Sequence, residues 1–86
     1  MITVKVVNRL GLHARPAMSF VDTASTFKAA ITVRKADTCV DGKSIMQMMM
    51  LAAGQGSELE IEADGEDCEK ALAALKALVD SGFDEE

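Results

Sequence analysis

The spacing of apolar and polar positions changes several times along the chain, and each spacing predicts a different element. Up to Asn8, alternate positions are apolar, which is typical of a half-buried strand. From Pro16 onward, apolar residues recur every three or four positions: Ala17, Phe20, Val21, Ala24 and Phe27. This spacing predicts an amphipathic helix of about three turns that begins at Pro16 and packs on a sheet.

Two short strands are predicted next, joined by a turn. Apolar Ile31 and Val33 indicate the first strand, the turn covers residues 35–37, and the second strand covers residues 38–40. The strand pattern then stops at Asp41, which is followed by a glycine.

A short, methionine-rich helix follows. Ser44 is suited to cap this helix, which we expect to run to Leu51 or Ala52 before a glycine-rich segment at 54–56 ends it. One sheet cannot bury every face of so short a helix, so core packing explains roughly half of its apolar residues. The others are expected to form an exposed patch suited to binding several partners in turn. The candidates for this patch are Ile45, Met46, Met49 and Met50.

The remaining residues predict a strand with one charged face and a final helix. Leu59, Ile61 and Ala63 alternate with glutamates, and a turn at 64–67 precedes the helix. The apolar face of this helix consists of Ala71, Leu72, Leu75, Leu78 and Val79. The order βαββαβα, with one apolar face on each helix, predicts an α+β fold in which a single antiparallel sheet is covered on one face.

Length and charge restrict the class of protein. The 86 residues allow one domain, residues 1–86, with a modest core. Of the net charge of −5, residues 1–56 contribute +4 and residues 57–86 contribute −9. The acidic half and the scarcity of aromatic residues argue against nucleic-acid binding. No apolar run approaches the roughly 18 residues of a membrane span, and the first residues have no signal-peptide layout. We therefore expect a cytoplasmic protein without membrane insertion, and a monomer.

The two cysteines suggest neither a metal site nor a redox motif. Cys39 and Cys68 form no CxxC pair, and there is no second histidine to complete a metal site with them. We expect two free thiols that are buried or half-buried.

The candidate chemistry centres on the single histidine, His13, which is followed closely by Arg15 and Pro16. Proline is favoured at the first position of a helix, and the N–H groups of a first turn have no partner within the helix. Such a helix start attracts anions, and the guanidinium of Arg15 offers a planar fork for phosphate oxygens. These residues indicate a phosphohistidine, although most lone histidines at such positions are surface or capping residues.

The segment Gly-Leu-His-Ala-Arg-Pro-Ala at positions 11–17 resembles the active-site signature of the HPr family. These proteins are the small phosphocarriers of the bacterial phosphoenolpyruvate-dependent phosphotransferase system. A second segment, Gly-Lys-Ser-Ile-Met at 42–46, resembles the part of HPr that carries its regulatory serine, at the matching distance. The resemblance covers nearly the whole chain. It implies an open-faced sandwich in which three helices lie on one face of a four-stranded sheet.

The resemblance also implies partners and roles. His13 would accept a phosphoryl group from phosphorylated enzyme I and pass it to a histidine of a sugar-specific enzyme IIA, with Arg15 stabilising the phosphate. Ser44 would be phosphorylated by an HPr kinase/phosphorylase where the cell has one, a role compatible with that of a helix cap. The chain would act as a carrier rather than an enzyme, and it would need no metal, nucleotide or other cofactor.

Two positions depart from the pattern of the sugar-pathway carriers. Leu10 stands where many of them have a small polar residue, and Gln47 replaces a glycine that often follows Ser-Ile-Met. Leucine at the first position is also familiar from the related nitrogen-branch carriers, so a nitrogen-branch regulatory phosphocarrier is an open alternative. A third interpretation is a non-catalytic regulator that acts only by docking through the exposed patch expected on the methionine-rich helix.

Overall fold

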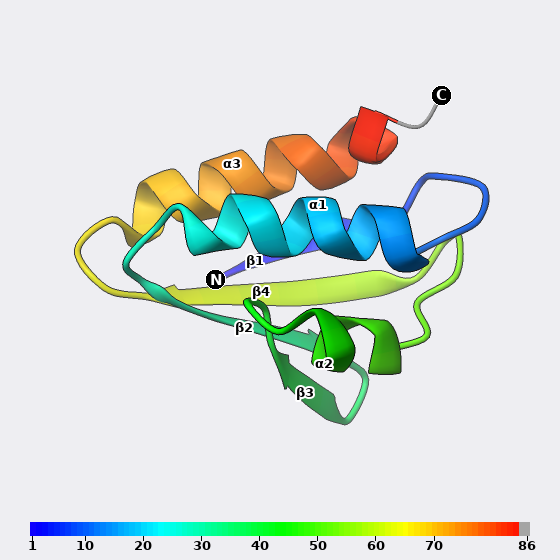
Figure 1. Ribbon diagram of the computed structural model, residues 1–86, viewed down its shortest axis with the longest axis horizontal. Helices are drawn as coiled ribbons and strands as arrows, with labels where there is room; N and C mark the ends of the chain where they lie inside the picture. Colours follow the sequence, from blue (N-terminus) through cyan, green and yellow to red (C-terminus); the bar gives the residue numbers. More distant parts are fainter. Residues whose placement is uncertain (85–86) are drawn as a thin grey trace.

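The alternating residues at the start of the chain form strand β1 of a four-stranded antiparallel sheet. The computed structural model describes residues 1–84 (Figure 1). The strands are β1 (Ile2–Lys5), β2 (Ala30–Lys35), β3 (Thr38–Asp41) and β4 (Glu58–Asp64), and they lie in the order β1-β4-β2-β3. The helices are α1 (Ala14–Ser25), α2 (Ile45–Met50) and α3 (Cys68–Asp80), and a 3-10 turn, η1 (Gly82–Asp84), follows α3.

The strand register separates a buried face of the sheet from a polar one. One row across the sheet joins residues that contribute to the core or pack against it: Ile2, Ile61, Val33 and Val40. The neighbouring row points to the other face and consists of Thr3, Glu60, Arg34 and Cys39. Arg34 and Glu60 form an ion pair on this open face. One face is therefore left to solvent, and the apolar helix faces cover the other.

The two long helices lie side by side over the sheet (Figure 1). Phe20 and Ala24 of α1 are fully buried, as are Leu75 and Val79 of α3. The short helix α2 contacts α1 and strand β3, and Met48 is its buried residue. These contacts confirm the predicted α+β fold, with the element order βαββαβα and three helices on one face of the sheet.

Several details differ from the sequence-based expectations. Strand β1 ends at Lys5 and not near Asn8, and helix α2 ends at Met50 and not at Leu51 or Ala52. Helix α1 begins at Ala14 and not at Pro16, because proline fits anywhere in a first turn, where its missing N–H group has no intrahelical acceptor. Cys39 is exposed and not buried, because its register partner is Arg34 on the open face. The turn η1 was not predicted, although its Phe83 is a core residue.

Within residues 1–84, no helix is both long and apolar enough to cross a bilayer. The longest helix, α3, has 13 residues.

Candidate functional site

His13 is the residue at which the extended chain turns into helix α1. Its backbone is extended, with φ −84° and ψ −167°, and its carbonyl oxygen accepts a hydrogen bond from the amide of Ala17 at 3.0 Å. The residue is half-buried. His13 therefore occupies the N-cap position, next to the positive end of the helix dipole.

The first turn of α1 places an exposed cation and two backbone donors after His13. The amides of Ala14 and Arg15 occupy the first two helical positions, where N–H groups have no partner inside the helix. The Arg15 side chain is exposed. The amide of Ala17 donates to the carbonyl of His13 and so does not face a ligand at the helix start, because α1 begins two residues earlier than predicted.

The loop before His13 is held against the segment that follows α2 (Figure 1). The amide of Leu12 donates to the carbonyl of Ala53 at 2.7 Å, and the Leu12 side chain is part of the core. Asn8 is also buried here, and its side chain donates to the carbonyl of Gly11 at 2.6 Å. Asn8 was not predicted as a site residue, although an asparagine before a glycine-containing turn is a recognisable signal.

Helix α2 presents three of its methionines to solvent and buries the fourth. Met46 is 76 % exposed, Met50 is 73 % exposed and Met49 is 47 % exposed, whereas Met48 is fully buried. Ile45, a candidate for the exposed patch, is half-buried and packs against the core, so it lies at the margin of the exposed surface. The residues Met46, Met49 and Met50 are called the methionine patch below. The C-terminal end of α2 leads directly to Ala53, the residue bonded to the loop that carries His13.

Ser44 caps the other end of α2. Its hydroxyl oxygen accepts a hydrogen bond from the amide of Gln47 at 3.3 Å, while the side-chain carbonyl of Gln47 accepts one from the amide of Asp41. The ammonium of Lys43, the residue before Ser44, donates to the carbonyl of Phe27 at 2.7 Å. Ser44 is separated from the Met50 end of α2 by about 9 Å of helix.

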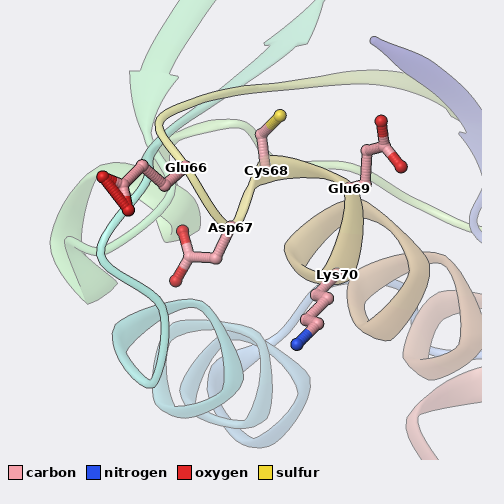
Figure 2. Close-up of a pocket in the computed structure, with 5 residues that line it drawn as sticks. All are labelled: Glu66, Asp67, Cys68, Glu69 and Lys70. Carbon is pink, nitrogen blue, oxygen red and sulfur yellow. The ribbon is translucent and has the colours of Figure 1, made fainter.

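A concavity at the start of α3 does not form a second site. It is lined by Glu66, Asp67, Cys68, Glu69 and Lys70. Figure 2 shows that the three carboxylates point in different directions. This concavity lies at the end of the molecule opposite to the loop before α1 (Figure 1). Across residues 1–84, no group of histidine, cysteine and acidic side chains is arranged to hold a metal ion.

Comparisons with known proteins agree with this arrangement. A family profile described as "PTS HPr component phosphorylation site" matches residues 1–81. The chain is 47% identical over 83 residues to a phosphocarrier protein HPr of Neisseria meningitidis, covering 96% of this chain and 93% of the relative. It is 44% identical over 84 residues to a phosphocarrier protein NPr of Proteus mirabilis, covering 96% and 93%.

A solved structure is also closely similar. The crystal structure of HPr-C-His from Thermoanaerobacter tengcongensis matches with a TM-score of 0.95 and 46% identity, covering 99% of this chain and 96% of that one. Sequence and fold agree over nearly the full length, and the chain belongs to the HPr family of phosphocarrier proteins of the phosphotransferase system.

Proposed function

We propose that this phosphocarrier accepts a phosphoryl group on His13 from phosphorylated enzyme I and passes it to enzyme IIA proteins in sugar uptake. The observation that carries the proposal is the position of His13. The only histidine of the chain is the N-cap residue of α1, directly before two backbone donors and the exposed cation of Arg15. These are the groups that bind a phosphate at a helix start.

The transfer is an exchange of phosphorus–nitrogen bonds. A ring nitrogen of His13 attacks the phosphorus of the donor's phosphohistidine, a new P–N bond forms, and the donor's P–N bond breaks with its electron pair returning to the donor imidazole. The reverse sequence unloads His13 onto the acceptor. The reaction demands positioning and charge stabilisation rather than covalent chemistry from other residues. Arg15 and the amides of Ala14 and Arg15 supply that stabilisation, and no cofactor takes part.

The methionine patch is the docking surface in this proposal. Exposed apolar side chains gathered on one short helix are suited to binding, and methionine adapts its shape to different partners. A carrier must bind its donor and its acceptors in turn, so an adaptable surface beside the reacting histidine fits that role. The chain is expected to act in the cytoplasm as a monomer.

Ser44 is the proposed regulatory phosphorylation site, used where the cell has an HPr kinase/phosphorylase. A phosphate there would add about −1.5 to −2 charges at the start of α2. Its effect on His13 must pass along the helix through the methionine patch, because Ser44 caps the far end of α2. We infer that such a phosphate weakens docking of an acidic partner surface through repulsion.

The second candidate is a nitrogen-branch carrier that performs the same chemistry with other partners. The relative named NPr favours it. So does Leu10, because leucine at this position resembles the nitrogen-branch carriers and because this side chain is 72 % exposed in the loop that carries His13, where a partner can contact it. The two candidates differ in the enzyme I that loads His13. Comparing loading by the sugar-branch and nitrogen-branch donors distinguishes them.

The decisive experiment is phosphorylation of the purified chain with phosphoenolpyruvate and enzyme I. We expect one acid-labile phosphate per chain, measured by intact mass, and none on His13→Ala. The variant should keep its melting temperature, because the backbone carbonyl of His13, rather than its ring, accepts the first hydrogen bond of α1. Labelling of His13→Ala at the wild-type rate would reject the assignment of His13. If the wild-type chain takes no label from enzyme I of either branch, the result would favour the third interpretation, a non-catalytic regulator that acts only by docking.

A further inference from the structure

The turn from Asn8 to Gly11 is closed by two hydrogen bonds that run in opposite directions. The side-chain nitrogen of Asn8 donates to the carbonyl of Gly11 at 2.6 Å, and the amide of Gly11 donates to the carbonyl of Asn8 at 3.1 Å. Among residues 1–83, Asn8 is the one charged or polar residue that is buried, with 8 % of its surface exposed. Burying a side-chain amide costs free energy unless the amide is hydrogen-bonded, so the bond to the Gly11 carbonyl offsets the burial of Asn8.

The peptide that Asn8 holds lies directly before the reacting histidine. Gly11 has φ +70°, and a Cβ atom at this position would lie 2.5 Å from the carbonyl oxygen of Ala53. The next residue, Leu12, is anchored through its amide to Ala53 and through its side chain to the core. The backbone is therefore fixed on one side by the segment after α2 and on the other by Asn8.

The C-terminal turn begins near Asn8. A Cβ atom built on Gly82 would lie 3.7 Å from the Cβ atom of Asn8, which is ordinary van der Waals distance. The start of η1 therefore lies close to Asn8.

We propose that Asn8 is a positioning residue for phosphoryl transfer at His13. It touches neither the phosphate nor the partner, and it acts by fixing the Gly11 carbonyl and hence the path of the backbone into the helix start. Without the donated bond, the peptide between Gly11 and Leu12 is held on one side only, by the bond from the Leu12 amide to Ala53. Its orientation is then less well defined, since glycine adopts many backbone conformations at little cost. The inference rests on the proposed function, because it requires that His13 is the residue loaded.

Two variants separate positioning from folding. Asn8→Asp keeps the shape of the side chain but replaces the donor with an acceptor, and Asn8→Ala removes both. With phosphorylated enzyme I as the enzyme and this chain as the substrate, we expect kcat to fall by roughly 10- to 100-fold, the loss typical of a slightly misplaced reacting group. KM should stay within about twofold of wild type, because the methionine patch is unchanged.

The control is Ala71→Gly, which destabilises a buried position in the first part of α3, remote from the loop. It should lower the melting temperature without lowering kcat. A kcat for Asn8→Asp and Asn8→Ala equal to that of wild type, or a loss matched by Ala71→Gly, would overturn the proposal.

A second measurement does not depend on phosphorylation. In NMR spectra we expect the Leu12 and His13 amide signals of Asn8→Ala to shift and broaden, while those of the first turns of α3, around Ala71, stay unchanged. Unchanged Leu12 and His13 signals would also overturn the proposal. If the wild-type chain takes no phosphate at all, the proposed function fails on its own, and these spectra still decide whether Asn8 positions the loop.

Discussion

A substitution at Arg15 tests whether the phosphate is stabilised by planar hydrogen bonding or by charge alone. A guanidinium donates two parallel hydrogen bonds to one phosphate, whereas an ammonium is a compact point charge. Arg15 is exposed in the first turn of α1, so Arg15→Lys should keep the wild-type melting temperature. We expect transfer from enzyme I to His13 to slow by roughly tenfold or more, the worth of one charge-assisted hydrogen bond.

Arg9→Lys is the matched control for this change. Arg9 is also an exposed arginine, but it belongs to the loop before His13 and not to the helix start. Single-turnover rates of both variants should be measured against wild type. Equal rates for Arg15→Lys and Arg9→Lys would remove Arg15 from phosphate stabilisation.

Residue types predicted the helix start at His13 better than they predicted its hydrogen bonds. The Pro16 signal indicated a helix start, and the structure confirms one, but a proline fits several positions of a first turn. The sequence could not show that the amide of Ala17 is used by His13, because this depends on where the first turn closes. The role of Asn8 could not be predicted because it depends on the burial of the side chain, and that burial depends on η1 and the segment after α2.

At the scale of the element, α2 illustrates why composition alone leaves a helix face undetermined. Every residue from 45 to 51 except Gln47 is apolar, so no periodicity distinguishes the buried positions. Packing against α1 and β3 selects Met48 and Leu51 for the core and exposes the methionine patch. The carbonyls of Leu51 and Ala52 accept hydrogen bonds from the ammonium of Lys35, a contact that no local pattern predicts.

The charge at the start of α2 can be changed without removing its cap. Aspartate and asparagine cap helices about as well as serine, so both Ser44→Asp and Ser44→Asn should keep the wild-type melting temperature. We expect Ser44→Asp to slow phosphorylation of His13 by enzyme I several-fold at low salt and less at high salt, because the repulsion is screened. The rate is measured at two ionic strengths.

Ser44→Asn separates charge from shape, since it differs from Ser44→Asp only in being neutral. It should be phosphorylated at the wild-type rate at both ionic strengths. If the two variants behave alike at low salt, Ser44 acts as a helix cap without a regulatory role.

At the scale of the whole molecule, the spacing of apolar residues along the chain was sufficient to predict the sheet and the helices on one face of it. Alternation identified β1 and β4, and the three-to-four spacing identified α1 and α3. The chain beyond α3 was not predictable in this way. Phe83 has φ +59° and is buried, and a left-handed phenylalanine is stable only because distant parts of the fold surround it.

Asp67 is a second residue whose role depends on parts of the chain that are distant in sequence. Its carboxylate accepts hydrogen bonds from the amides of Lys28 at 2.8 Å and Ala29 at 2.9 Å, and so joins the turn before α3 to the loop between α1 and β2. Gly65 allows this close approach, since a Cβ atom there would lie 2.7 Å from the Cα atom of Ala29. The bond from the Lys28 amide lowers the pKa of Asp67, and that from Ala29 does so further, against the opposing effect of desolvation.

The lowered pKa of Asp67 determines how this link responds to acid. The folded protein favours the charged carboxylate, so the link contributes its full stability above the ordinary aspartate pKa of about 4, and loses it as the pH falls through the lowered value. Asp67→Asn should therefore melt at a lower temperature than wild type at pH 7, with the difference shrinking toward pH 3. Glu66→Gln, which neutralises the neighbouring exposed carboxylate, should show neither effect. A difference for Asp67→Asn that stays constant across this range would mean that the two amide bonds act through shape, and that the charge on Asp67 adds nothing to the joining of the two loops.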